Sequence, residues 1–242
     1  MNRLIPALAA LGLAAAPASA ASFFDGFEDE TTGSTILNYD GFANWTVTFG
    51  TVDLVRSGEF GITCRTGNYC VDLDGSTSQA GWMELKSPLA LSAGDVVDLV
   101  SWISGNQRGG DSDRFLVQVR FFTLVDLSEV QFLFPTGYTV PASFTGLIAI
   151  GTPGLVAPRD PFGTYGLRFR TLTDTTFTVR FVHWANPTAL SGQGDNIGAI
   201  LDDVSVRIVP AGVIPEPATW AMLIAGFGLV GLAARRRQRA PA

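Results

Sequence analysis

The segment Phe177-Thr178-Val179-Arg180-Phe181 decides the fold class of this chain. Its three apolar side chains alternate with two polar ones. In a β-strand, side chains two residues apart lie on the same face, so this spacing is typical of a strand with one face in a core. A helix would need apolar residues three and four positions apart, and this segment does not have that pattern.

Working outward, comparable strand-like runs recur along the whole central region. They occupy residues 45–49, 52–56, 69–73, 82–86, 96–103, 115–125, 130–134, 144–150, 165–171, 177–184 and 199–208. Turn-forming clusters such as Asp74-Gly75-Ser76 separate the runs, and no long amphipathic helical pattern lies between them. The sequence therefore predicts an all-β fold in residues 21–209, built as a two-sheet antiparallel β-sandwich.

The N-terminus has the three parts of a secretory signal. Arg3 provides the positive region, residues 4–16 the short apolar region, and Ala18-Ser19-Ala20 a small-residue cleavage site. We expect residues 1–20 to be a signal peptide removed by signal peptidase, because the apolar part is short for a membrane span and is interrupted by prolines.

The C-terminus combines an acidic triplet between prolines, an apolar run and an arginine cluster. The triplet is Pro215, Glu216 and Pro217, with Trp220 and Ala221 after it, and the arginines are Arg235, Arg236, Arg237 and Arg239. Residues 210–217 form a linker that the prolines keep out of a helix. Residues 218–234 are predicted to be a transmembrane helix of about 25 Å, and the basic tail 235–242 is expected to stay in the cytoplasm.

This order of features resembles the PEP-CTERM sorting signal of Gram-negative bacteria, in the variant PEPxxWA. The resemblance implies recognition by an exosortase, a membrane-embedded cysteine transpeptidase. It also implies transient anchoring in the membrane and delivery to the cell surface or the extracellular matrix. An ordinary C-terminal anchor helix is the alternative, since arginine side chains and local thinning of the bilayer can compensate for a short span.

Two cysteines, Cys64 and Cys70, are the only ones in the chain. In an exported protein a close, even pair is typical of a disulfide, and Gly67-Asn68 between them favours a turn. A metal site is less favoured because the chain has one histidine and no second cysteine pair. A redox role is also less favoured, because the spacing is not Cys-x-x-Cys.

The charge of residues 21–214 argues against a nucleic-acid partner. This region holds 11 basic and 21 acidic side chains, a net charge of −10. Nucleic-acid binding needs a positive surface. An acidic domain rich in turns is instead compatible with an exported protein that binds calcium.

The central region also resembles the galactose-binding-like, carbohydrate-binding-module type of jelly roll. The resemblance rests on the opening Asp25-Gly26-Phe27-Glu28, on the segment 71–76, on the segment 104–108 and on the ending at residues 200–206. It implies a structural calcium that joins the terminal strands. Glu28 and Asp202 stand at the matching positions, with Asp203 or Asp25 as substitutes. The alternative is that these carboxylates are only solvated at the ends of strands.

The sequence offers little for catalysis. His183 is the single histidine and continues the apolar face of its strand, and no Gly-x-Ser-x-Gly elbow surrounds a serine. Asp72, Asp74, Asp111 and Asp113 are expected to be acidic turn residues, because neither pair has the glycine and distal glutamate of an EF-hand. A pair of carboxylates for glycoside hydrolysis remains open, because the sequence does not give their separation.

Aromatic and arginine side chains are the remaining candidates for ligand contact. Trp82 follows Gly81, and Arg108 precedes Gly109-Gly110. A tryptophan can stack on a sugar ring, and an arginine can bind hydroxyls or a sugar carboxylate. We expect a non-catalytic domain that binds extracellular polysaccharide. A structural or adhesive surface protein without a glycan ligand is the alternative, and a small glycan hydrolase is a third.

Overall fold

The computed structural model describes residues 21–30, 33–77, 79–184, 196–211 and 224–227 of the 242-residue chain. One compact unit spans Ala20–Ala211, and a second comprises Met1–Ser19 with Gly212–Ala242. Within the described residues, no helix has the length and apolar character needed to span a bilayer. The predicted signal peptide, the PEP triplet and most of the predicted transmembrane helix lie outside these residues, and only 224–227 is described there, as a helical segment.

The larger unit consists of strands and the loops that join them. The described strands are β1 (Ala21–Asp25), β2 (Trp45–Phe49), β3 (Asp53–Arg56), β4 (Tyr69–Asp72), β5 (Trp82–Leu85), β6 (Leu89–Leu91), β7 (Val96–Ser104), β8 (Asp113–Phe134), β9 (Gly137–Tyr138), β10 (Ala142–Val156), β11 (Gly163–Thr171), β12 (Thr175–Trp184) and β13 (Ile200–Val209).

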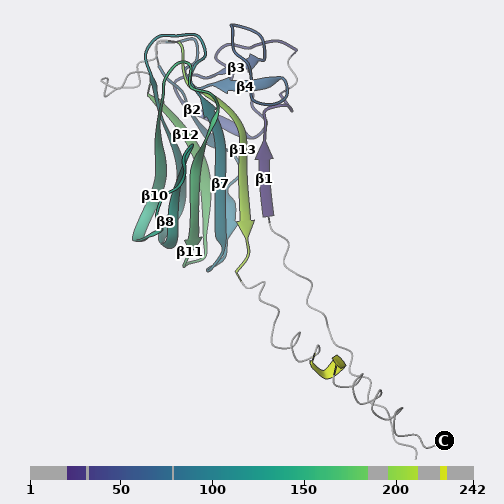
Figure 1. Ribbon diagram of the computed structural model, residues 1–242, viewed down its shortest axis with the longest axis vertical. Helices are drawn as coiled ribbons and strands as arrows, with labels where there is room; N and C mark the ends of the chain where they lie inside the picture. Colours follow the sequence, from purple (N-terminus) through teal and green to yellow (C-terminus); the bar gives the residue numbers. More distant parts are fainter. Residues whose placement is uncertain (1–20, 31–32, 78, 185–195, 212–223, 228–242) are drawn as a thin grey trace, which may run out of the picture. The chain divides into compact units, whose positions relative to one another are not determined.

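These strands form one antiparallel sheet that folds over into two layers. The order along it is β2-β5-β12-β8-β11-β7-β13-β4-β3, with β1 on β13 and β10 on β8. The long strand β8 belongs to both layers, because Phe121 and the residues before it pair with β12, whereas Leu127 and those after it pair with β11. We call the β2-β5-β12 layer sheet I and the β11-β7-β13 layer sheet II; Figure 1 shows β11, β7, β13 and β1 side by side.

The hydrophobic core lies between the two sheets. Phe115 of sheet I meets Tyr165 of sheet II at a ring-centroid distance of 4.8 Å, and Phe121 meets Phe169 at 5.8 Å. At the other side of the sandwich, Phe23 of β1 meets Trp45 of β2 at 5.9 Å. The alternating residues of the sequence therefore do face a common core, and the predicted antiparallel β-sandwich is confirmed.

The strands follow the predicted runs with one informative difference at β8. The sequence suggested two strands, 115–125 and 130–134, where the structure has one. The chain stays paired between these two runs. A bulge at Glu129, which has a positive φ of 56°, accommodates the register shift of β8 against β11. A bulge of this kind bends a strand without ending its pairing.

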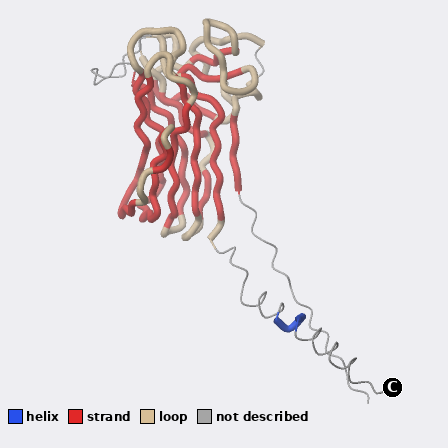
Figure 2. Tube along the Cα trace, in the orientation of Figure 1, coloured by secondary structure: helices blue, strands red, loops and turns tan. Residues whose placement is uncertain are grey.

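The two ends of the sandwich differ in their connections. Figure 2 shows long loops gathered at the end where β3 and β4 lie, which we call the loop end, and short turns at the opposite end, the turn end. The last described residue of the unit, Ala211, lies at the turn end, where its N–H donates to Asp95 Oδ1 at 2.9 Å.

Candidate functional site

The outer face of sheet I carries an aromatic pair next to a charged network. Met83 and Leu85 of β5 point into the core, so Trp82 and Glu84 point away from it. Trp82 pairs with Phe49 of β2, and their ring centroids are 5.0 Å apart. Phe49 keeps 42% of its surface exposed. We call this region, with the charged residues described next, the Trp82 face.

Glu84 is the centre of the charged network on the Trp82 face. Arg180 of β12 donates to Glu84 from Nε at 2.8 Å and from Nη2 at 2.6 Å, and Arg120 of β8 donates to it at 3.0 Å. The guanidinium carbon of Arg180 also lies 5.7 Å from the centre of the Trp82 ring. The network holds polar groups in fixed positions beside the aromatic pair, which is the arrangement needed to bind a ring with many hydroxyl groups.

The residues suggested as calcium ligands converge on the disulfide loop. Cys64 and Cys70 are bonded, as predicted, with their Cα atoms 5.5 Å apart. Glu28 Oε1 accepts hydrogen bonds from the backbone N–H groups of Asn68 at 2.7 Å and Tyr69 at 2.8 Å. Gly67 in this loop has a positive φ of 58°, and a Cβ there would lie 2.3 Å from the Glu28 carboxylate. Glycine is therefore required at the position where Glu28 approaches the loop.

Asp202 and Asp203 contact the first half of the same loop. Asp202 Oδ2 accepts from the N–H groups of Arg65 at 2.8 Å and Thr66 at 3.1 Å. Asp203 accepts from the Thr66 hydroxyl at 2.8 Å and pairs with the Arg65 guanidinium, which also lies 3.7 Å from the centre of the Trp102 ring. We call Glu28, Asp202 and Asp203 together the acidic clasp.

The electrostatics of the acidic clasp follow from its burial. Asp202 is fully buried, and this burial raises its pKa to about 7, with the neighbouring Asp203 carboxylate acting in the same direction. The N–H donors of Arg65 and Thr66 oppose the rise. In the acidic clasp, N–H groups of the disulfide loop therefore bind a carboxylate that has been removed from water. The burial favours its neutral form, and the N–H donors favour its charged form.

Calcium at the clasp stays a prediction. The oxygens that would bind an ion accept hydrogen bonds from the disulfide loop, and the Arg65 guanidinium brings a positive charge beside Asp203. The substitute ligand Asp25 accepts from the Trp45 indole at 2.8 Å and from the Phe27 N–H at 2.7 Å. In the described part of the chain, no group of three or more acidic, histidine or cysteine side chains has the spacing to hold a metal.

Arg108, the second candidate for ligand contact, lies at the loop end and pairs with Asp72. Asp72 is 1% exposed and Asp113 is 2% exposed at the start of β8, so the expectation of an acidic turn residue is wrong for both, and Asp74 is also buried. The register of β4 against β3 and β13 covers Asp72 from both sides, which the local sequence does not show. Burial raises the pKa of Asp72 well above its usual value, and the positive charge of Arg108 opposes that rise.

His183 is fully buried and continues the core face of β12, as its place in the sequence predicts. Its Nε2 atom lies 3.5 Å from Asp113 Oδ1 and 3.4 Å from the backbone nitrogen of Ala199. A substrate in solvent has no access to a side chain in this position.

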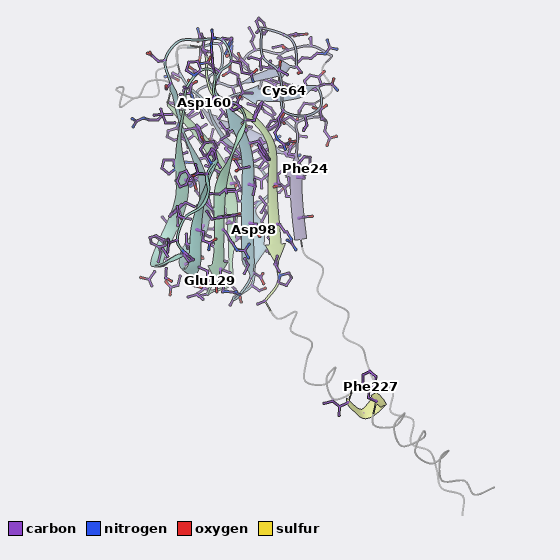
Figure 3. The ribbon with its side chains drawn as sticks, in the orientation of Figure 1. Phe24, Cys64, Asp98, Glu129, Asp160 and Phe227 are labelled. Atoms are coloured by element: carbon purple, nitrogen blue, oxygen red, sulfur yellow. A yellow bond between two sulfur atoms is a disulfide. The ribbon has the colours of Figure 1, made fainter. Side chains whose placement is uncertain are left out.

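A separate pocket lies beside the disulfide loop, with a volume of about 420 Å³. Its lining includes Thr63, Arg65, Gln107, Arg159 and Phe162. Figure 3 places Cys64 and Asp160, which also line it, at the loop end. Gln107 closes one side, because its amide both accepts from the Thr63 N–H and donates to the Thr63 carbonyl, each at 2.9 Å.

The sequence identified Trp82 but missed its partners. Phe49, Glu84, Arg120 and Arg180 lie on four different elements, and only the register brings them together. Period-two spacing does place Trp82 with Glu84, and this signal was present in the sequence. The local sequence gives no sign that β5 pairs with β12, because this pairing joins residues nearly a hundred positions apart.

Comparison with known proteins gives a match to a family model at the C-terminus and weak likenesses to solved structures. Residues 213–237 match the PEP-CTERM protein-sorting motif, which confirms the resemblance of the C-terminus. No curated protein sequence matches the chain. Among solved structures, the CBM22-1 xylan-binding domain of Xyn10C from Paenibacillus barcinonensis is similar, at 11% identity and a TM-score of 0.38. That match covers 74% of this chain and 94% of the xylan-binding domain, and a likeness of this size does not carry a ligand across.

Proposed function

We propose that this is an exported surface or matrix protein whose β-sandwich binds polysaccharide without catalysis. The sorting motif at residues 213–237 supports export, anchoring through the predicted helix 218–234 and processing by an exosortase. Removal of residues 1–20 by signal peptidase belongs to the same proposal. The sandwich is then the part of the protein that meets the extracellular polysaccharide.

The observation that carries the binding proposal is the Trp82 face. A partly exposed pair of aromatic rings lies beside a carboxylate held by two arginines, on a rigid sheet. Sugar rings stack on aromatic side chains through their apolar faces, and their hydroxyls bond to charged groups that are already oriented. Since the groups are fixed by strand pairing, binding needs little ordering of the protein.

A purely binding role also agrees with the state of the charged groups on this face. Glu84 accepts hydrogen bonds from both Arg120 and Arg180, so its oxygens are already engaged within the protein. A glycosidase needs one carboxyl group as a proton donor and a second one opposite it. The Trp82 face therefore supports contact with a glycan better than it supports cleavage of one.

The test uses the sandwich alone, residues 21–211, which contains its own core and disulfide. We expect it to be retained on one or more immobilised polysaccharides in a panel of neutral and acidic polymers. Trp82→Ala should weaken binding about tenfold or more, as loss of a central aromatic contact does. Phe24→Ala is the matched control, because Phe24 is an exposed aromatic of β1 in the other sheet.

Two results would overturn the proposal. One is the absence of retention on every polymer in the panel, which favours a structural or adhesive protein with no glycan ligand. The other is an equal loss in Trp82→Ala and Phe24→Ala, which would place the binding surface elsewhere. Release of reducing sugar ends during incubation would instead support a hydrolase.

A further inference from the structure

The pocket beside the disulfide loop, which we call the loop pocket, lies between three segments of the chain. They are residues 63–65, residues 104–107 and residues 159–162. Its volume of about 420 Å³ is within the range of pockets that bind small molecules. None of the residues that line it belongs to the Trp82 face, so the proposed function gives it no role.

Hydrogen bonds hold these three segments in place against one another. Gly105 donates its N–H to the carbonyl of Asp160 at 3.1 Å, and Gln107 donates its N–H to the carbonyl of Pro158 at 2.8 Å. The Gln107 side chain connects the same turn to the backbone of Thr63. The loop pocket is therefore formed before a ligand arrives, which lowers the entropy that binding would cost.

Part of the lining is apolar. Phe162 is half-buried and lies at the pocket next to Cys64, whose sulfur is bonded to Cys70. The Phe162 side chain packs against a small buried cluster that consists of Val55, Ile62, Cys64, Cys70 and Ile200. A fixed aromatic ring in a polar pocket suits the apolar face of a sugar ring.

Arg159 is an arginine of the loop pocket that has no carboxylate partner. Residues 21–211 contain ten arginines, and seven of them form ion pairs with Asp or Glu in the described part of the chain. Arg159 forms none there, although the region 21–214 has a net charge of −10. It is also exposed. Its planar guanidinium is therefore available to an anion, and it matches the geometry of a carboxylate.

The other charged side chains of the lining are Arg65 and Asp160. Arg65 is fixed by its ion pair with Asp203 and by the Trp102 ring, and its side chain keeps 32% of its surface exposed. Asp160 Oδ2 accepts a hydrogen bond from the N–H of Ala157 at 2.7 Å. The negative charge of Asp160 opposes an anion in the pocket, and this opposition can be removed by substitution.

We propose that the loop pocket binds a carboxylated sugar, a uronic acid unit of an extracellular polysaccharide. The carboxylate pairs with the guanidinium of Arg159, the sugar ring lies against Phe162, and the remaining donors of Arg65 bond to hydroxyl oxygens. This second site goes beyond the proposed function and does not depend on the Trp82 face, because the two share no residue.

The test titrates residues 21–211 with the methyl glycosides of glucuronate and galacturonate, and with those of glucose and galactose. Each uronate differs from its neutral counterpart only at the carboxylate. We expect the uronates to bind about tenfold or more tightly than the neutral sugars by calorimetry. Tryptophan fluorescence should change with the same affinity, because Arg65 lies on the Trp102 ring.

Two variants test the role of Arg159. Arg159→Gln should weaken uronate binding about tenfold and leave the neutral sugars unaffected. Arg207→Gln is the matched control, because Arg207 is also exposed, forms no ion pair in the described part of the chain and lies outside the pocket. An equal loss in both variants would mean that the uronate responds only to overall charge, and it would overturn the proposal.

Asp160→Asn keeps the proposal testable if Arg159→Gln does not fold. It removes the opposing charge and retains an oxygen that can accept from Ala157, so uronate binding should strengthen about twofold. Unchanged or weaker binding contradicts the proposal, and so does a failure of wild type to prefer uronates. Trp82→Ala should leave uronate binding intact. A loss in Trp82→Ala would overturn the second site, whereas retention of uronate without any effect of Trp82→Ala on polysaccharide binding would overturn only the Trp82 face.

Discussion

The Trp82 face and the acidic clasp use the same residue types in different ways. On the Trp82 face, Glu84 and its arginines are partly open to solvent and their contacts follow from neighbouring strands. In the clasp, Asp202 and Asp203 are buried and hold a loop from 136 to 138 positions earlier in the chain. The difference lies in the carboxylates. The Glu84 side chain keeps 17% of its surface exposed and can be reached from solvent, whereas Asp202 and Asp203 are buried and hold the fold together.

The two regions also differ in how much stability they provide. The ion pairs of Glu84 are partly exposed, at 17% for Glu84 and Arg180 and 43% for Arg120, so water and salt screen them in part. A buried carboxylate that loses its partner destabilises a protein much more, because no water replaces the partner. Substitutions at the loop end should therefore affect unfolding, and those on the Trp82 face should affect binding.

The largest expected effect is that of Arg108→Ala. It leaves the buried Asp72 without its cation, and we expect the free energy of unfolding to fall by about 3 kcal/mol. Arg168→Ala is the matched control, because Arg168 lies 3.0 Å from Asp98 but is 42% exposed, and it should cost less than about 1 kcal/mol. Urea denaturation of both variants measures the difference. Equal losses would remove the distinction between buried and exposed pairs.

The next effect is that of the disulfide. Replacing both Cys64 and Cys70 by serine should lower the free energy of unfolding by about 2 kcal/mol, because the closed loop is short. Thermal unfolding measures the loss. Wild-type protein with its disulfide reduced should show the same loss as the double serine variant. Polysaccharide binding by the Trp82 face should be unchanged, and a parallel loss of binding would mean that the two regions are coupled.

A smaller effect is expected for Glu28→Ala, which removes the acceptor for two loop N–H groups. Water can reach Asn68, so the loss should be about 1 kcal/mol. The same melting curves, recorded in calcium and in EGTA, test the calcium prediction. That prediction expects a lower melting temperature in EGTA for wild type and no such difference for Glu28→Ala. An unchanged wild-type curve in EGTA would count against the ion.

A different kind of effect is expected at the clasp, in the way that stability changes with pH and not in the stability at one pH. The pKa of Asp202 is about 7 in the folded chain, above its ordinary value of 3.8, so the folded state binds the proton more tightly than the unfolded chain does. Its contribution to stability is present below pH 3.8 and is lost as the pH rises toward 7. Asp202→Asn should flatten the fall in unfolding free energy between pH 4 and 7. Part of the slope should remain, because Asp72 titrates in the same direction.

Much of the fold could be predicted because it depends on local patterns. The alternation of Phe177, Val179 and Phe181 does place these side chains in the core, and the run at residues 45–49 is a strand with the predicted bounds. The strand β1 was missed because its five residues directly follow the predicted signal peptide and show no clear alternation. Its place depends on pairing with β13 at the opposite end of the domain.

The candidate site was predicted only in part. The residue type of Trp82 and its neighbouring glycine point to ligand contact, and the structure adds the aromatic and charged residues around it. The burial of the acidic residues was harder to predict, because the local sequence around a carboxylate near a turn is the same whether the side chain is solvated or buried. Asp72 shows this difficulty, since the strands on both sides of it cover it.

By itself the sequence determined the β class, the close cysteine pair and the sorting motif. Each of these depends on residues near one another in the chain, for which side-chain spacing and covalent reach are sufficient. Only the tertiary structure decided that Glu28, Asp202 and Asp203 hold the disulfide loop, and that Glu84 lies between two arginines. These features arise from strand register and burial, which join distant residues and depend on the whole fold.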